Sequence, residues 1–194
     1  MIPLKDLNPR SGFPTVTLSL IVVNTLIFLF QLSLGPNGHQ FVVTYGMVPA
    51  RLKLYMAGGD EQFLSATLPL FTSMFLHGGW AHLIGNMWFL WIFGGSVEEQ
   101  FGHASYLLFY LICGLVAGMA QVAFTFASDL PGIGASGAIA GVLGAYLLLF
   151  PRAKILTLMT FVVYFGRVEL PAVVLSAYGF SRSSGARRCR CTRE

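Results

Sequence analysis

The segment Gly134-Ala135-Ser136-Gly137 places a serine among small residues at the start of an apolar stretch. A serine hydroxyl attacks an acyl carbon when a base within hydrogen-bond reach takes its proton. The negative oxygen that then forms is stabilised by hydrogen-bond donors aimed at it. Ser136 is therefore a candidate nucleophile for acyl transfer, and the chemistry depends on which donors and bases the fold brings beside it.

Two candidate donors lie in an earlier apolar stretch. His82 and Asn86 are four residues apart, so they share one face of a helix. With the backbone N–H of Ser136, close to a helix N-terminus, they could form the donor set of an oxyanion hole. The alternative is that both side chains tie helices together or lie at the membrane interface. Because polar, ionisable groups are uncommon inside spanning helices, a functional role is favoured.

The remaining histidines are less informative. His77 lies next to Gly78, close to the expected start of the same helix, and is a supporting candidate. His39 and His103 are predicted to lie in loops without a catalytic role. All four histidines precede Ser136. The sequence therefore offers a nucleophile and an oxyanion site without an evident general base.

The glycines around the serine also have a purely structural interpretation. Small residues recur every four positions in two stripes, Gly137, Gly141 and Ala145, and then Ser136, Ala140 and Gly144. Such stripes let two membrane helices approach closely. The motif also lacks the closing glycine of a G-x-S-x-G elbow, because Ala138 stands there. Taken alone, it does not separate a nucleophile from a packing residue.

The composition is that of a membrane protein. Of the 194 residues, 55% are hydrophobic and 10% are charged, whereas soluble domains average about 25% charged residues. A spanning helix needs roughly 20 mostly apolar residues, and the bilayer offers its backbone no other hydrogen-bond partner. We predict an all-α, multi-pass protein with four clear spans, at 16–35, 80–97, 104–127 and 134–150. The long connection 36–79 is expected to carry function or to lie in the interface.

Basic residues predict the orientation in the membrane. They precede the first span and follow the fourth, at Lys5, Arg10, Arg152 and Lys154. Four crossings and the positive-inside tendency place both groups in the cytoplasm, although Arg51 and Lys53 then fall outside. We expect an integral protein of a bacterial inner membrane with a cytoplasmic N-terminus.

After residue 150 the pattern changes. Two apolar runs, 155–165 and 170–180, are each too short to cross a bilayer and amount to an incomplete fifth span. The basic tail 181–194 either contacts anionic lipid or results from a reading-frame shift. It supplies most of the net charge of +4, so the charge does not indicate a nucleic-acid partner. Cys189 and Cys191 are at most half of a zinc site, and we predict no metal.

Three segments form a combined pattern: Phe71-Thr72-Ser73-Met74-Phe75-Leu76-His77-Gly78-Gly79-Trp80-Ala81-His82-Leu83-Ile84-Gly85-Asn86-Met87, then Gly94-Gly95-Ser96-Val97-Glu98 with Gly102, then Gly134-Ala135-Ser136-Gly137. Together with Tyr45-Gly46-Met47-Val48-Pro49, this pattern resembles the rhomboid family of intramembrane serine proteases over about residues 14–180. The predicted units are then a cytoplasmic segment 1–13, a rhomboid-like membrane domain 14–180 and the tail 181–194.

The resemblance implies a bundle that normally has six spans, with a water-filled cavity that opens outward. Ser136 would be the nucleophile, and His82, Asn86 and the Ser136 amide would hold the oxyanion. His77, Gly134 and Gly137 would support the site, without cofactor or metal. Substrates would be single-pass membrane proteins in the lipid bilayer, cut within or beside their spanning helix.

The family's general base is a histidine on the sixth span, and no histidine of this sequence matches it. The chain is therefore expected to be truncated or frame-shifted relative to the family, with impaired proteolysis. One alternative is an inactive rhomboid-like protein that binds membrane proteins without cutting them. A channel or transporter subunit is less well supported, because the spans lack the several buried charges that such pathways use.

Overall fold

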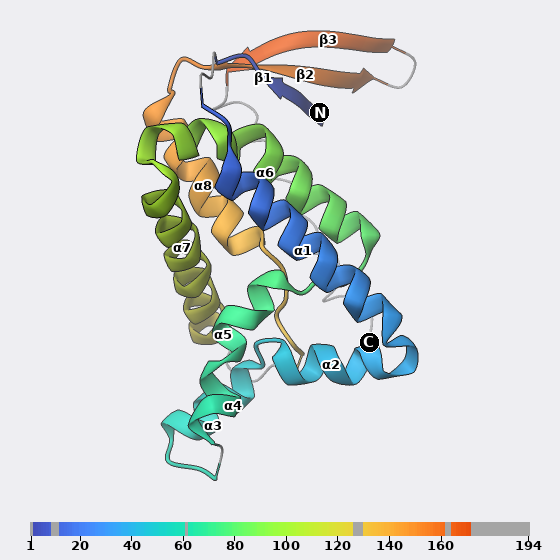
Figure 1. Ribbon diagram of the computed structural model, residues 1–194, viewed down its shortest axis with the longest axis vertical. Coiled ribbons are helices and arrows are strands. Elements are labelled where there is room, and N and C mark those ends of the chain that lie inside the picture. The colour runs from blue at the N-terminus through green and yellow to red at the C-terminus, as the bar shows by residue number, and fades with distance from the viewer. Residues whose placement is uncertain (1, 9–11, 61, 126–129, 162–163, 172–194) are drawn as a thin grey trace.

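The computed structural model describes residues 2–8, 12–60, 62–125, 130–161 and 164–171. Most of these residues are helical. A three-stranded antiparallel sheet covers one end of the long helices, and the shorter helices lie at the opposite end (Figure 1). In chain order the elements are β1 (Ile2–Asp6), α1 (Thr15–Ser33), η1 (Gly35–Asn37), α2 (Gly38–Tyr45), α3 (Pro49–Met56), α4 (Phe63–Thr67), α5 (Pro69–Thr72), η2 (Ser73–Phe75), α6 (Trp80–Phe101), α7 (His103–Phe124), α8 (Ser136–Leu149), β2 (Lys154–Phe161) and β3 (Tyr164–Pro171).

The four long helices, α1, α6, α7 and α8, fall on the four apolar segments predicted from the sequence. Two of them, α1 with 19 residues and α7 with 22, are long and apolar enough to cross a bilayer. Helix α6 also has 22 residues but carries several polar side chains, and α8 is apolar with 14 residues. The prediction of a mostly helical fold with long apolar helices is therefore confirmed. The count of four spans with an incomplete fifth stays a prediction.

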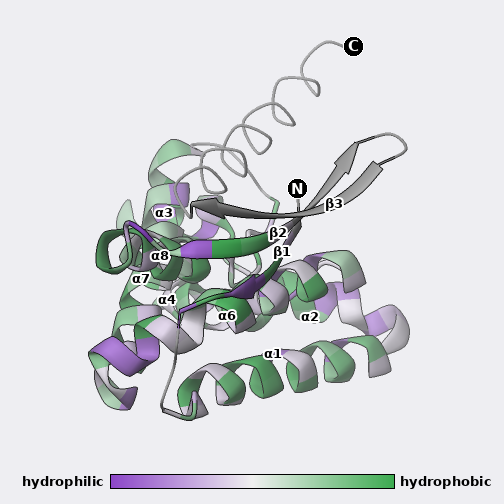
Figure 2. Cartoon of the chain, turned by 90° about the horizontal axis from the view of Figure 1, so that it is seen from above, coloured by the Kyte–Doolittle hydropathy of each residue, from purple (hydrophilic) through white to green (hydrophobic). Residues whose placement is uncertain are grey.

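The outer faces of α1 and α7 are apolar. Leu26 and Phe30 of α1 and Leu108 and Val116 of α7 are each more than half exposed. Figure 2 shows the hydrophobic character of α1 along most of its length. A contiguous apolar surface of this kind is unfavourable in water, whereas lipid tails cover it without cost. The exposed side chains therefore agree with placement in a bilayer.

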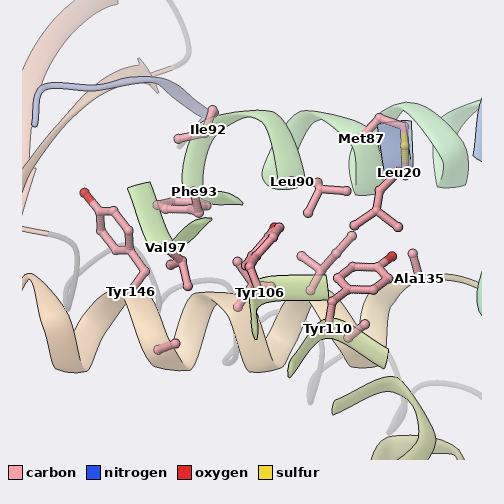
Figure 3. Packing of buried hydrophobic residues seen from close by; sticks show 14 of the residues in the cluster. Leu20, Met87, Leu90, Ile92, Phe93, Val97, Tyr106, Tyr110, Ala135 and Tyr146 are labelled. Carbon is pink, nitrogen blue, oxygen red and sulfur yellow. The ribbon is translucent and has the colours of Figure 1, made fainter. Parts of the chain in front are cut away.

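The core lies where α8 packs between α6 and α7 (Figure 3). The ring of Tyr146 on α8 meets Phe93 of α6 edge to face, with ring centroids 5.0 Å apart. Tyr106 and Tyr110 of α7 are fully buried beside them. Aromatic side chains thus fill the space around the C-terminal half of α8, whereas small residues occupy the start of the helix.

Small residues let α8 approach α7 closely. Gly137 faces Ala117 and Gly141 faces Cys113, with no room for a Cβ at either glycine. This is the first of the two predicted stripes, and it gives Cys113 a packing role. The second stripe is open: within the described part of the chain, nothing lies within 4 Å of the place a Cβ on Gly144 would take. Gly144 of the second stripe is therefore not used for close packing by the described residues.

A buried carboxylate joins three helices at the end near the sheet. Glu98 of α6 is 1% exposed and accepts hydrogen bonds from the backbone N–H groups of Val16 and Thr17, both at 2.8 Å. The Thr17 hydroxyl donates to it at 2.6 Å, and Nδ1 of His103 lies 2.6 Å away. First-turn N–H groups of a helix lack intrahelical acceptors and carry partial positive charge. Glu98 therefore caps α1 from a neighbouring helix.

The two histidines that we predicted in loops lie in helices. His39 is in α2, and His103 is the first residue of α7. The turn between α6 and α7 consists of Gly102 alone, whose φ of 77° reverses the chain in a single residue. No loop remains there to hold His103, which instead contacts Glu98.

The expectation of an all-α chain is wrong for residues 2–6, which form β1, and for the strands β2 and β3 after α8. The apolar run 155–165 falls on the hairpin of β2 and β3, and β2 pairs with β1, matching Asp6 to Ile155. A run of this length cannot cross a bilayer as a helix, whereas paired strands satisfy their backbone groups outside it. The first two residues of the run 170–180 end β3, whereas the rest of that run and the tail 181–194 with its two cysteines lie outside the described residues.

The N-terminal segment is anchored to the helices by a buried polar network. Asp6 is 2% exposed and accepts hydrogen bonds from the Ser96 hydroxyl at 2.5 Å and the Tyr146 hydroxyl at 2.7 Å. The indole N–H of Trp88 donates to the Pro3 carbonyl at 2.7 Å. Strand β1 therefore holds α6 and α8 together at the end far from Ser136.

Replacing Glu98 with alanine should destabilise the bundle by about 2–5 kcal/mol, because the Val16 and Thr17 amides lose a charged acceptor while remaining buried. The change can be measured as the shift in equilibrium unfolding in mixed detergent micelles. Glu99→Ala is the matched control, since Glu99 is exposed and a surface carboxylate contributes about 1 kcal/mol or less. Equal effects of the two substitutions would contradict the capping role.

Candidate active site

Ser136 is the first residue of α8, and its side chain is exposed. The preceding Ala135 is fully buried. At this position the backbone N–H has no intrahelical acceptor, and the partial positive charge of the helix N-terminus is strongest. The local fold thus presents a hydroxyl and an unpaired amide at the same point. These are the two groups that an attacking serine and its oxyanion require.

His82, in the first turn of α6, faces the backbone that leads to Ser136. A Cβ built on Gly134 would lie 2.6 Å from both Cε1 and Nε2 of the His82 ring, so the imidazole edge rests against this glycine. Gly134 has a φ of +117°, a conformation that side chains disfavour. Position 134 therefore needs glycine for two reasons. The contact places the His82 ring against the backbone two residues before the candidate nucleophile.

A hydrogen bond to Nδ1, the second ring nitrogen of His82, favours one tautomer of the ring. The backbone N–H of Gly78 donates to Nδ1 at 3.4 Å. A neutral imidazole that accepts at Nδ1 carries its proton on Nε2. His82 therefore presents an N–H donor, not an acceptor, toward Gly134 and Ser136. In this state the ring can stabilise a negative oxygen but cannot take the serine proton.

Asn86 and His77 form a second pair beside His82. The Asn86 amide nitrogen lies 3.1 Å from Nε2 of His77, and it is 3.6 Å from the place a Cβ on Gly134 would take. The rings of His77 and His82 pack edge to face, with centroids 5.2 Å apart. Burial, and to a smaller extent the neighbouring His82, lowers the pKa of His77 to about 4. His77 is therefore neutral at neutral pH and accepts a hydrogen bond from Asn86.

Backbone contacts hold the segment 132–134 in place, and none of them was evident from the sequence. Met47 and Gly132 exchange two backbone hydrogen bonds, at 3.0 and 2.8 Å. The N–H of Gly134 donates to the Ser73 carbonyl at 2.8 Å. Met47 belongs to the Tyr45–Pro49 motif noted in the sequence, but backbone pairing leaves no signature in residue types. The long connection 36–79 therefore positions the approach to Ser136.

Helix α7 contacts α5 and η2 through two small residues. Gly114 packs directly against Met74, and a Cβ on Gly118 would lie 3.8 Å from Leu70. These are the glycines of the close-packing motif that the sequence showed in this helix. Their contacts hold the segment whose Ser73 carbonyl accepts from Gly134, so this packing supports the path of the backbone that leads to the serine.

A small cavity adjoins the serine. It has a volume of about 110 Å³, and its lining includes Ser136, Gly134, Ser73, Met74 and the side chain of Gln121 on α7. One water molecule occupies about 30 Å³ of liquid, so the cavity has room for water near the hydroxyl. The polar groups around it can hold such water.

The structure therefore brings His82, Asn86 and His77 together next to Gly134, two residues before Ser136. Gly137, expected to support the site, packs against Ala117 of α7 and also lines the cavity that adjoins Ser136. Within the part of the chain that the structure describes, no side chain hydrogen-bonds the Ser136 hydroxyl. The described ranges also contain no group of three or more histidine, cysteine, aspartate or glutamate side chains placed to bind a metal ion.

Comparison with known proteins assigns the sequence to a family. The Rhomboid domain family matches residues 65–183, more than half of the chain. The chain belongs to the rhomboid family. The matched region includes α6, α7 and α8, and therefore every residue placed around Ser136 except Met47.

Several curated relatives share this rhomboid sequence. The chain is 35% identical over 139 residues to "Rhomboid protease GluP" of Bacillus subtilis (strain 168), covering 71% of this chain and 25% of GluP. It is 29% identical over 143 residues to "Rhomboid protein 1, mitochondrial" of Saccharomyces cerevisiae (strain ATCC 204508 / S288c), covering 71% of this chain and 37% of the relative. "Putative rhomboid protease YdcA" of B. subtilis (strain 168) is 36% identical over 78 residues, covering 40% of this chain and 39% of YdcA. The chain thus spans well under half the length of these relatives.

Substituting Gly134 by alanine should destabilise this rhomboid by about 2–4 kcal/mol, because the new Cβ strains the backbone and collides with the His82 ring. Equilibrium unfolding in mixed micelles measures the loss, and the His82 ring signals in NMR spectra should shift with it. Gly144→Ala is the matched control: it lies on α8 in open space and should change stability by about 1 kcal/mol or less. A Gly134→Ala protein with unchanged stability and His82 signals would contradict the contact.

Proposed function

We propose that the protein is an intramembrane serine endopeptidase that cuts the transmembrane segments of single-pass membrane proteins. The observation that carries the proposal is the convergence of the His82 Nε2–H edge and the Asn86 amide on the backbone just before an exposed serine at a helix N-terminus. Membership in the rhomboid family, with relatives named as proteases, supports the same reaction class. Neither metal nor cofactor enters the proposed chemistry.

In the proposed reaction, Ser136 Oγ attacks the carbonyl carbon of the scissile peptide bond. Negative charge then develops on the carbonyl oxygen, which receives hydrogen bonds from His82 Nε2–H, the Asn86 amide and the Ser136 N–H. Donors held in advance toward this position contribute typically a hundredfold to a thousandfold each in rate. Water or hydroxide takes the serine proton, the amine leaves with a proton from water, and water from the adjoining cavity then hydrolyses the acyl-enzyme to release the carboxylic acid and the free serine. The fixed tautomer of His82 suits it to this donor role.

Removal of the serine proton is the slow step of the proposed reaction. A serine hydroxyl needs a base to accept its proton, and His82 carries its own proton on the nitrogen that faces the site. This 194-residue polypeptide has no histidine after Ser136. Loss of the base lowers the rate of serine proteases by several orders of magnitude, while the oxyanion hole still contributes. We therefore propose that this polypeptide cleaves slowly.

Ser136→Ala should abolish cleavage of a single-span reporter by the protein in liposomes, since the nucleophile is lost. Ser19→Ala is the matched control, because Ser19 is exposed on α1 and its hydroxyl donates only to the Thr15 carbonyl of its own helix. The measurement is the rate of appearance of the reporter fragment. Cleavage that survives Ser136→Ala would contradict the assignment of the nucleophile.

Cleavage by the unmodified chain should rise with pH by roughly tenfold per unit and should increase when imidazole is added, because no histidine side chain accepts the serine proton. A histidine base would instead give a rate that levels off above the ordinary histidine pKa of about 6.5. Initial rates across a pH series in the same liposomes distinguish the two profiles. A plateau without response to imidazole would show that one of the four histidines is the base.

A second candidate function is binding of membrane proteins without cleavage. The observation that favours it is the Ser136 hydroxyl, which has no hydrogen-bond partner among the described residues. Binding of a single-span protein would then survive Ser136→Ala, and no fragment would form with either chain. The fixed donor set around Gly134 favours the protease, since binding alone does not require it.

We also propose that the N-terminus lies in the cytoplasm of a bacterial cell. Lys5 and Lys154 lie on the paired strands β1 and β2 at one end of the bundle, whereas Arg51 and Lys53 belong to α3 at the other (Figure 1). The relatives include both bacterial and mitochondrial proteins, so the compartment rests on the bacterial ones.

A further inference from the structure

Gln31, near the end of α1, is hydrogen-bonded to the segment that precedes α6. Its side-chain N–H donates to the His77 carbonyl at 2.8 Å, and its side-chain oxygen lies 3.5 Å from the His77 backbone nitrogen. The two groups of one amide therefore meet both backbone groups of a single residue. No pattern in the sequence relates Gln31 to the histidines 46 and 51 residues later.

The carbonyl that Gln31 binds belongs to the same peptide group as the N–H that fixes His82. The His77–Gly78 peptide accepts a hydrogen bond from Gln31 at its oxygen and donates one to His82 Nδ1 at its nitrogen. A peptide group is planar, so the direction of its C=O sets the direction of its N–H. A hydrogen bond to the oxygen also polarises the N–H and strengthens its own bond. Gln31 and His82 are therefore linked through one rigid group.

The other contacts of His77 do not fix the rotation of the His77–Gly78 peptide plane. The His77 ring is tied by Nε2 to Asn86, while its buried Nδ1 has no well-formed hydrogen bond among the described residues. Phe28 packs against the rings of both His77 and Trp80, with centroids 6.5 and 5.1 Å apart. Ring packing restricts position but is compatible with rotation of the peptide plane next to two glycines. The Gln31 bond is directional and acts on that rotation.

We propose that Gln31 is a positioning residue that orients the His77–Gly78 peptide and so keeps His82 in the tautomer with its proton on Nε2. The inference rests on the proposed function for its effect on cleavage, but its effect on the His82 tautomer is independent of any activity. Without Gln31, the peptide turns, Nδ1 of His82 loses its donor, and the ring populates both neutral tautomers. The donor that faces Gly134 and Ser136 is then present only part of the time.

The test is NMR of the full chain in micelles with ¹⁵N-labelled histidine, at about pH 8, where an ordinary histidine with a pKa of about 6.5 is neutral. The unmodified protein should show His82 as a single Nε2–H tautomer. Gln31→Met, which keeps the length of the side chain and removes both hydrogen bonds, should give a mixture of tautomers. Gln40→Met is the matched control, since Gln40 is exposed on α2, and it should leave the His82 signals unchanged.

Cleavage of the single-span reporter gives a second readout. Gln31→Met should lower kcat by about 10- to 100-fold with KM unchanged, the size expected for a misplaced catalytic group. The same substitution in a His82→Ala background should have no further effect, because the group through which it acts is gone. Gln31→Glu can accept from the His77 N–H but cannot donate to its carbonyl, so it should behave as Gln31→Met and serves if that variant does not fold.

The outcomes separate this inference from the proposed function. A folded Gln31→Met protein with a single unchanged His82 tautomer overturns the inference, whether or not the reporter is cut. A mixture of tautomers in a protein whose unmodified form never cuts upholds the positioning role and overturns the protease. Equal losses of kcat in the presence and absence of His82 would show that Gln31 acts only through general stability, and would also overturn the inference.

Discussion

The approach of the segment 132–136 to α6 is possible because position 134 has no side chain. The His82 ring occupies the space that a Cβ would take, and the positive φ of Gly134 turns the backbone so that Ser136 begins α8 directly afterwards. The Ser73 carbonyl and the Met47 backbone then fix this path. Every contact of the candidate site on this side follows from that one close approach. A side chain at position 134 would separate the His82 ring from the backbone that leads to Ser136.

Helix α1 supports the site without contributing a reacting group. At one end Glu98 caps its first turn, and at the other Gln31 binds the His77 backbone. Thr17, Asn24 and Gln31 recur every seven residues and so lie near one face of the helix. Thr17 and Asn24 are fully buried on that face. A polar seam of this kind fixes the rotation of α1 about its axis, which an apolar face alone specifies less sharply in lipid.

The sequence was sufficient to predict the four long helices, because runs of apolar residues with so few charges have one stable form in a bilayer. The spacing of His82 and Asn86 likewise predicted a shared helical face. The sequence did not predict the sheet, because an apolar run such as 155–165 fits a short strand as well as it fits part of a spanning helix. The bonds of Gln31, Met47 and Ser73 were also missed. They involve backbone groups, which every residue type carries, so no pattern of residue types marks them.

The oxyanion half of the site and the proton-transfer half have separate physical origins. The donors are held by contacts within residues 28–137, and none of these contacts needs a base beside Ser136 in order to form. In the proposed protease, loss of a base would therefore lower the rate of the chemical step without removing the geometry proposed to stabilise the transition state. The Gly78 N–H links the two halves. In the proposed reaction, the hydrogen bond that favours a proton on His82 Nε2, and so suits the ring to stabilise a negative oxygen, also disfavours uptake of the serine proton at that nitrogen.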